Sequence, residues 1–304
     1  MGEENSRVFA MLQDIPFNVQ CGVRSLLDAS EDIRLLDFTF STGGCINHGG
    51  RLRTTAGDFF LKWNDARKFE SMFKVEAAGL QLLRDTNTIN IPEVLGYGVE
   101  GAFQFLLLAF IEQSYPSSRY WQKLGRQLAL LHQAQKDYNG LDHDNYMGSL
   151  KQYNQRNSSW SEFFIAQRLS VQVELAAAAG RVDNALVNSF QKLYTKLPSL
   201  LPEETPSLLH GDLWGGNVMR DESGDPVLID PAVYYGSREI DLAATRLFGE
   251  FDSAFYGAYE EAFPLHPGHA ERIDLYNLYP LLVHLNLFGS SYLPGIREIL
   301  NRFL

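Results

Sequence analysis

The sequence predicts an α+β protein with a small β-rich N-terminal lobe and a larger helical C-terminal lobe. Its 304 residues are enough for about two domains. Alternating apolar residues dominate the chain up to about residue 112, and helical spacing dominates the rest. We therefore place the domains at residues 1–112 and 113–304. We expect the ligand site in a cleft between the two lobes, where binding pockets often form.

The N-terminal lobe is predicted to combine an antiparallel sheet with two helices. Apolar positions at mixed helical spacing favour a helix within residues 6–28. Short strands with a glycine-bearing turn between them follow within residues 35–64. Residues 69–83 place apolar side chains on one face of a helix, and residues 94–111 are typical of two further strands.

The C-terminal lobe is predicted to be mainly helical. Helical spacing is clearest in residues 120–135, 160–180, 181–197 and 276–288. One segment of short strands and loops, residues 208–235, interrupts this pattern. Most of the unusual residues of the chain fall in that segment, so we expect it to hold the chemistry.

Composition excludes several classes of protein. The net charge of −11 argues against a general nucleic-acid binder, which needs a basic surface. We see no apolar run of the length that spans a membrane and no basic and apolar segment typical of a secretory signal at the start. The two cysteines, Cys21 and Cys45, make a disulfide scaffold or a structural zinc site unexpected. We expect a cytoplasmic protein without nucleic-acid or membrane partners.

The most informative stretch is LLHGDLWGGNVM, residues 208–219, followed by PVLIDP, residues 226–231. Four residues separate Asp212 from Asn217, which is the spacing of the catalytic loop in phosphoryl transfer enzymes. An apolar strand then leads to Asp230. The Asp230 carboxylate and the Asn217 amide oxygen are hard ligands that suit Mg²⁺, and Asp212 can orient an acceptor hydroxyl and take its proton. This pattern predicts transfer of a phosphoryl group from ATP with Mg²⁺.

A second candidate pair consists of Lys62 on a predicted strand and Glu76 on the following helix. In kinases, such a glutamate holds the lysine against the α- and β-phosphates of ATP. Glu70 is the competing partner, but Glu76 is preferred because it lies on the same face of the predicted helix as the apolar Phe73 and Leu80. The alternative is that Lys62 is a solvated lysine on an edge strand.

A glycine-rich segment, residues 41–50, precedes Lys62 and contains Gly43, Gly44 and Cys45. Glycines allow close approach of the backbone to phosphates, whose charge exposed N–H groups bind. The alternative is an ordinary glycine-rich hairpin turn. Backbone dipoles there would favour the thiolate of Cys45, so reversible oxidation could block ATP binding. An inert Cys45 is the equal alternative.

Taken together, these residues resemble the fructosamine/ketosamine-3-kinase family, a branch of the protein-kinase-like fold related to aminoglycoside and choline phosphotransferases. The resemblance covers nearly the whole chain and is most specific in HGDLWGGN and IDPAVYYG, residues 210–217 and 229–236. It implies a two-lobed kinase fold and ATP-dependent phosphorylation of the sugar 3-hydroxyl of a ketosamine such as a ribulosamine, erythrulosamine or fructosamine. That activity serves deglycation, and the acceptor is a small ketoamine or a glycated lysine of a protein.

The resemblance also implies a role for individual residues. Asp212 would be the catalytic base, Asn217 and Asp230 would hold Mg²⁺, and Lys62 with Glu76 would hold the phosphates of ATP.

Further roles concern the two ends of the substrate pair. Backbone groups of Ala109, Phe110 and Ile111 would meet adenine, and Trp214 would offer an aromatic wall to the sugar or its amine. The sequence departs from the family at Ser237, where histidine is usual, and at Ala109, where an acidic residue is common.

Other functions remain as alternatives. The acceptor could instead be another amine-bearing alcohol, of the aminoglycoside or choline type. A protein kinase is disfavoured because only about ten residues separate Asp230 from Asp241, too few for a peptide-presenting activation segment. A nucleotide-binding pseudokinase is disfavoured because the groups required for catalysis are present. We expect a monomer and leave a redox-linked dimer open.

Several conspicuous residues have plainer interpretations. We expect Asp241 to order the catalytic loop through backbone hydrogen bonds and His210 to bond within that loop. His132 is expected to be a buried helix residue satisfied by the catalytic region. Trp160 and His284 are expected to lie in the core or along the wall of a groove.

Overall fold

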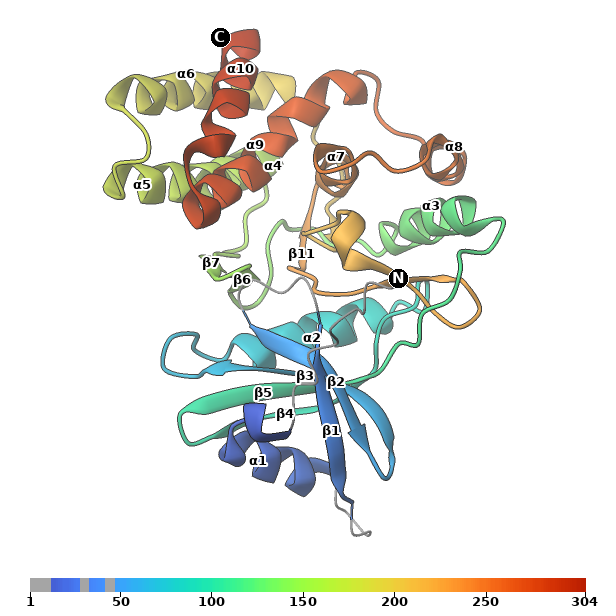
Figure 1. Ribbon diagram of the computed structural model, residues 1–304. Coiled ribbons are helices and arrows are strands. Elements are labelled where there is room, and N and C mark those ends of the chain that lie inside the picture. Colours follow the sequence, from blue (N-terminus) through green and yellow to red (C-terminus); the bar gives the residue numbers. More distant parts are fainter. Residues whose placement is uncertain (1–11, 28–32, 42–46) are drawn as a thin grey trace, which may run out of the picture. The chain divides into compact units, whose positions relative to one another are not determined.

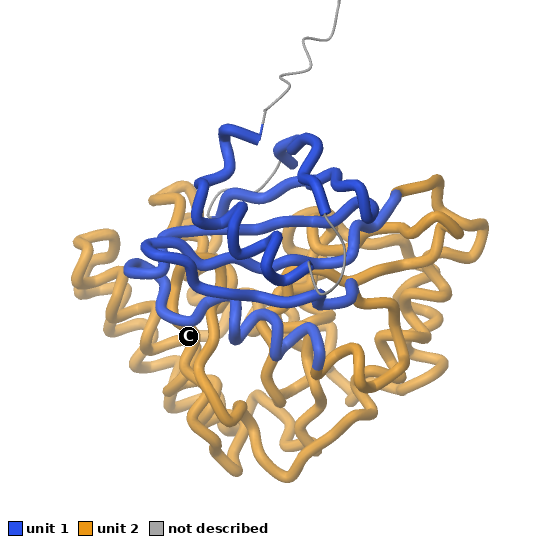
Figure 2. Tube along the Cα trace, turned by 90° about the horizontal axis from the view of Figure 1, so that it is seen from below, with its two compact units in different colours: residues 1–81, 92–112 blue, residues 82–91, 113–304 orange. Residues whose placement is uncertain are grey.

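The computed structural model describes residues 12–27, 33–41 and 47–304 (Figure 1). The chain divides into two compact units, coloured separately in Figure 2. The first unit runs to residue 81 and resumes at residues 92–112, and the second comprises residues 82–91 and 113–304. The short segment 82–91 therefore groups with the second unit although it precedes the last strands of the first.

The first unit is built on a five-stranded antiparallel sheet with the strand order β1-β2-β3-β5-β4. The strands are β1 (Leu35–Phe40), β2 (His48–Thr54), β3 (Gly57–Asp65), β4 (Val94–Glu100) and β5 (Phe103–Ala109). Helix α1 (Phe17–Leu27) packs on β4 and β5 (Figure 1). Its Val19 and Val23 join Phe38, Trp63 and Leu107 of the strands in one buried core, which fixes the face of the sheet that alternate residues occupy.

Helix α2 (Met72–Arg84) follows β3 and buries the apolar face that the sequence predicts. It begins three residues later than residue 69, the start expected from spacing. The cause is Ser71, whose φ of 56° is incompatible with a right-handed helix. Phe73 and Leu80 are buried on this helix, so the face that bears Glu76 adjoins the packed side of α2.

The second unit is mainly helical. It contains α3 (Tyr120–Leu131), α4 (Trp160–Phe163), α5 (Ser170–Ala178), α6 (Asn184–Leu200), α7 (Glu239–Leu247), α8 (Ser253–Ala262), α9 (His269–Phe288) and α10 (Leu293–Phe303). The single helix predicted over residues 160–180 is interrupted by a π-helical turn at Phe164–Leu169. None of the helices described combines the length and apolar character needed to cross a bilayer.

Short two-stranded ribbons hold the segment that the sequence singles out. Strand β8 (Ser207–Leu209) pairs with β11 (Tyr234–Gly236), and β9 (Val218–Arg220) pairs with β10 (Pro226–Leu228). The loops 210–217 and 229–233 each run from one ribbon to the other. Strand pairing therefore fixes both ends of each loop, which keeps the two loops next to each other. A third ribbon, β6 (Asn145–Met147) with β7 (Leu150–Gln152), was not expected from the sequence.

Candidate active site

The catalytic loop begins at His210, directly after the buried strand β8. Gly211 has a φ of 83°, which favours glycine. A Cβ atom at this position would also lie 2.1 Å from the carbonyl oxygen of Ala232. The sequence Gly211-Asp212 therefore follows from both the turn and the close approach of the second loop.

Asp241 on α7 holds this loop through hydrogen bonds to its backbone, as expected. Its carboxylate accepts hydrogen bonds from the backbone N–H groups of His210 (2.7 Å) and Gly211 (2.9 Å). His132 Nε2 donates to the same carboxylate (3.2 Å) and His132 Nδ1 accepts from Tyr259 Oη (2.8 Å). Burial alone would raise the pKa of Asp241, but the hydrogen bonds from His132 and the loop lower it.

His210 bonds within its own loop, which also agrees with the expectation. Its Nε2 donates to the carbonyl oxygen of Ile229 (2.9 Å), and its Nδ1 accepts the N–H of Asp212 (3.3 Å). Burial lowers the pKa of His210, so the ring is neutral at pH 7 and joins the two loops as a structural link.

Asp212 and Asn217 are in direct contact. The amide nitrogen of Asn217 donates to the backbone oxygen of Asp212 (2.8 Å) and to its Oδ2 (3.1 Å). Burial raises the pKa of Asp212 to about 7, and repulsion from the Asp230 carboxylate adds to that effect while the Asn217 hydrogen bond opposes it. Since the nitrogen of Asn217 serves Asp212, its amide oxygen is the atom suited to a cation.

Asp230 lies in the second loop with a φ of 53°. The preceding residue, Ile229, donates its N–H to the carbonyl oxygen of Asn217 (3.1 Å), which joins the two loops again. The carboxylate of Asp230 and the amide oxygen of Asn217 fit the oxygen preference of Mg²⁺. Among the residues described, no group of three or more His, Cys, Asp or Glu could hold a metal.

Trp214 extends from the same loop with 39% of its surface exposed. A Cβ atom at Gly216 would lie 2.3 Å from the indole ring, so the glycine makes room for the tryptophan. The rings of Phe248 and Trp214 meet edge to face, with their centroids 6.2 Å apart, and the ring centroid of His284 lies 4.4 Å from that of Phe248. The indole is therefore one end of a series of rings at the surface of the second unit.

The first unit brings Lys62 and Glu76 together. Lys62 Nζ lies 2.7 Å from Glu76 Oε1, and the two side chains are only 9% and 13% exposed. Lys62 is on β3, the middle strand of the sheet, so the edge-strand alternative is wrong. Asp212 belongs to the other unit.

Other predicted residues can be placed more briefly. Ala109 ends β5 and donates its N–H to the carbonyl oxygen of Glu93 (2.9 Å). This amide hydrogen is therefore not available to adenine. The ring of Phe110 lies under the Arg51 guanidinium, and Ile111 follows it. Gly43, Gly44 and Cys45 lie outside the residues described, so their binding and redox roles stay predictions.

The aromatic Trp160 and the polar Ser237 both lie in the interior of the second unit. Trp160 is 1% exposed and stacks on Phe164, so it belongs to the core. Ser237 is also 1% exposed and donates to Glu204 Oε1 (3.0 Å). The departure from the family at Ser237 is therefore accommodated inside the second unit.

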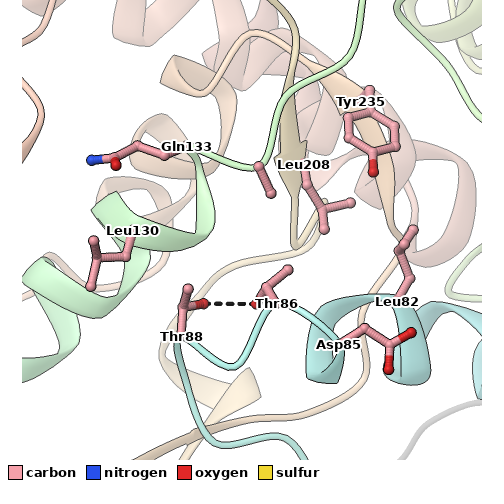
Figure 3. A pocket seen from close by; sticks show the side chains of 9 residues that line it. Leu82, Asp85, Thr86, Thr88, Leu130, Gln133, Leu208 and Tyr235 are labelled. Atoms are coloured by element: carbon pink, nitrogen blue, oxygen red, sulfur yellow. Dashed lines mark hydrogen bonds between the residues drawn. The ribbon is translucent and has the colours of Figure 1, made fainter.

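A cavity of about 440 Å³ lies elsewhere in the second unit (Figure 3). Thr86 and Thr88 share a hydrogen bond of 2.8 Å at its wall. The lining residues are Leu82, Asp85, Thr86, Thr88, Leu130, Gln133, Ala134, Leu208 and Tyr235. None of the predicted site residues is among them, so this cavity and the catalytic loops are different places.

Comparisons with known proteins give one answer. The family described as fructosamine kinase matches residues 27–304. A probable ketoamine kinase of Synechocystis is 39% identical over 86% of this chain and 88% of its own length. The chloroplastic protein-ribulosamine 3-kinase of indica rice is 40% identical over 86% of this chain and 77% of its own length.

Solved structures agree. A candidate fructosamine-3-kinase of Haemophilus somnus is similar with a TM-score of 0.84 at 30% identity, covering 97% of this chain and 98% of its own. An aminoglycoside phosphotransferase, at 15% identity and a TM-score of 0.60, shares the fold over 92% of this chain and 96% of its own. The fold is thus α+β and protein-kinase-like, and the enzyme is a phosphotransferase that acts on a hydroxyl group. The chain belongs to the fructosamine kinase family.

Proposed function

We propose that this kinase transfers the γ-phosphoryl group of ATP to the sugar 3-hydroxyl of a ketoamine and uses Mg²⁺. One observation carries the proposal: Asp212 is bonded to Asn217 and its pKa is raised to about 7. A carboxylate with a pKa near neutrality can accept the proton of a hydroxyl group. The acceptor class follows the relatives, which are named ketoamine kinase and protein-ribulosamine 3-kinase.

Each of the two units would bind mainly one of the two substrates. Lys62, held by Glu76, would bind the α- and β-phosphates of ATP. Backbone groups of residues 109–111 and of the segment 43–45 would contact the rest of the nucleotide. We assign nucleotide binding mainly to residues 1–112 and acceptor binding to residues 113–304, where Trp214 would lie against the sugar or its amine.

In the proposed reaction, Asp212 orients the sugar hydroxyl toward the γ-phosphorus. The hydroxyl oxygen forms a bond to this phosphorus while the bond to the β–γ bridging oxygen breaks and ADP leaves. The hydroxyl proton passes to the Asp212 carboxylate. Asn217 and Asp230 would hold Mg²⁺, which when bound neutralises charge on the phosphates.

The proposed product would account for a role in deglycation. A phosphate at carbon 3 of a ketoamine is prone to leave by elimination, which frees the amine. Both a small ketoamine and a glycated lysine of a protein fit this chemistry.

The test is a screen of acceptors with ATP and Mg²⁺, followed by ³¹P NMR and mass spectrometry. Ribulosamine, erythrulosamine and fructosamine derivatives should be offered as free amines and on a glycated protein. We expect a phosphate whose coupling to the proton on carbon 3 identifies the position. Phosphorylation of aminoglycosides or choline but of no ketoamine would refute the proposal, and nucleotide binding without any turnover would indicate a pseudokinase. The Asp212→Asn variant controls for contaminating kinases.

A further inference from the structure

The backbone of Asp230 is in a conformation that needs support. Its φ of 53° is uncommon for a residue other than glycine, and such a conformation persists only where neighbouring bonds fix it. On the N-terminal side those bonds come from the catalytic loop. Ile229 donates its N–H to Asn217 (3.1 Å), and its carbonyl oxygen accepts from His210 Nε2 (2.9 Å).

On the C-terminal side the support comes from the β6–β7 hairpin. Gln152 Nε2 donates to the carbonyl oxygen of Ala232 (3.0 Å), and Asn145 Nδ2 donates to that of Val233 (2.9 Å). The donors lie 80 and 88 residues from their acceptors along the chain. Both side chains are buried, with 1% and 4% exposed, so water does not replace these bonds easily.

The two amides are themselves held in place. Gln152 Nε2 also donates to Asn145 Oδ1 (2.8 Å), and Tyr279 Oη donates to Gln152 Oε1 (2.8 Å). Asn154 Nδ2 donates to Asn145 Oδ1 (2.9 Å), and Arg168 Nη2 donates to Asn154 Oδ1 (2.7 Å). Each amide therefore has a fixed direction, and the hydrogens that face the loop cannot be exchanged for oxygens without breaking this network.

The acceptor at Ala232 lies where the two active-site loops touch. A Cβ atom at Gly211 would come 2.1 Å from this same carbonyl oxygen. The Ala232 N–H is donated to the carbonyl oxygen of His210 (2.9 Å). Pro231 has no N–H of its own, so the segment after Asp230 depends on these bonds. Holding the Ala232 carbonyl thus sets the spacing between the loops of Asp212 and Asp230.

We propose that Gln152 and Asn145 are positioning residues that direct the Asp230 carboxylate toward the metal. The inference rests on the metal role given to Asp230 in the proposed function. Loss of a residue that orients a metal ligand lowers metal affinity or activity by about 10- to 100-fold. The hairpin would therefore tune metal-dependent nucleotide binding without touching nucleotide or metal.

The test uses two variants and a matched control. Gln152→Met keeps the length of the side chain and removes the amide that holds Ala232. Tyr279→Phe keeps the buried ring and removes only the hydroxyl that orients Gln152. Tyr276→Phe is the control, because it removes another buried hydroxyl of α9 that donates instead to Ser237 Oγ (3.2 Å).

The measurement is calorimetric binding of a non-hydrolysable ATP analogue with Mg²⁺ and with a chelator. We expect Gln152→Met to reduce the gain in affinity due to Mg²⁺ by about 10-fold or more. Tyr279→Phe should reduce the gain less, and Tyr276→Phe should leave it unchanged. Affinity in the presence of chelator should be the same in all variants, which a general loss of structure would not produce.

A parallel Asp230→Ala variant separates this inference from the proposed function. If Asp230→Ala abolishes the gain and Gln152→Met retains it in full, the positioning role is wrong while the metal role stands. If Asp230→Ala leaves the gain unchanged, the metal role fails and the positioning role fails with it. If Gln152→Met does not fold, the comparison of Tyr279→Phe with Tyr276→Phe decides, and equal gains would overturn the inference.

Discussion

Replacement of Asp241 by asparagine tests how the catalytic loop is held. The carboxylate is 1% exposed and accepts two backbone N–H bonds, from His210 and Gly211, as well as one from His132. Asparagine has nearly the same shape but only one acceptor oxygen. Whichever way the amide turns, its NH₂ group faces a donor, so at least one buried N–H loses its partner.

The expected magnitude follows from these contacts. A hydrogen bond to a charged group contributes about 1.5–3 kcal/mol, and an unpaired buried donor costs about 1–3 kcal/mol. We therefore expect Asp241→Asn to lower the free energy of unfolding by about 2–4 kcal/mol. Asp212 follows Gly211 directly, and a displacement of about 1 Å at such a group can reduce turnover on the order of 100-fold. We expect kcat to fall by about that factor.

The assay combines urea unfolding, followed by tryptophan fluorescence, with steady-state phosphorylation of a ketoamine. Asp252→Asn is the matched control, since exposed Asp252 caps α8 by accepting the Ala254 N–H (2.8 Å) and asparagine caps helices equally well. We expect the control to change stability by less than about 0.5 kcal/mol. Unfolding free energy and kcat both close to those of the wild type in Asp241→Asn would refute this account of the loop.

Four further predictions concern the two units. Asp212→Asn should reduce kcat by about 10²- to 10⁴-fold with little change in nucleotide affinity, measured by kinetics and calorimetry; near-native turnover would reject Asp212 as the base. Glu76→Gln removes a charged bond to Lys62 and should raise the KM for ATP by about 10-fold, whereas an unchanged KM would separate the pair from the nucleotide. Trp214→Ala should raise the KM for a ketoamine by about 2- to 10-fold and leave the KM for ATP alone; the reverse pattern would contradict the acceptor role. Burial lowers the pKa of His210, so the folded ring stays neutral while the unfolded one binds a proton below about pH 6.5. Unfolding free energy should therefore fall as pH decreases from about 6.5, and this acid sensitivity should be weaker in His210→Gln.

Much of the site could be read from residues close together in the chain. The spacing of Asp212 and Asn217 predicted one catalytic loop, and in the structure Asn217 Nδ2 lies 3.1 Å from Asp212 Oδ2. The helical face of Phe73 and Leu80 correctly favoured Glu76 as a partner of Lys62. Asp241 was expected to order the loop, and it does so through two backbone bonds. The first inference succeeds because a short spacing within one loop translates directly into geometry, and the second succeeds because helical periodicity fixes which residues share a face.

Other features had no local signal. The π-helical turn at Phe164–Leu169 breaks a stretch whose composition is uniformly helical. Ser71 takes a left-handed conformation that spacing does not reveal, so the start of α2 was misplaced. Ser237 departs from the histidine usual in the family, and the sequence does not reveal that its side chain lies inside, bonded to Glu204.

By itself, the order of residue types determined the alternation that makes the sheet, the periodicity that makes the helices, and the loop with the chemical groups of a kinase. Only the tertiary structure decided what holds those groups at the right angle. Gln152 and Asn145 donate hydrogen bonds to backbone carbonyl groups 80 and 88 residues away. Every residue has such a carbonyl group, so the sequence does not show which ones accept these bonds. Hydrogen bonds between distant segments have no period and no fixed spacing, so they become visible only once the chain has folded.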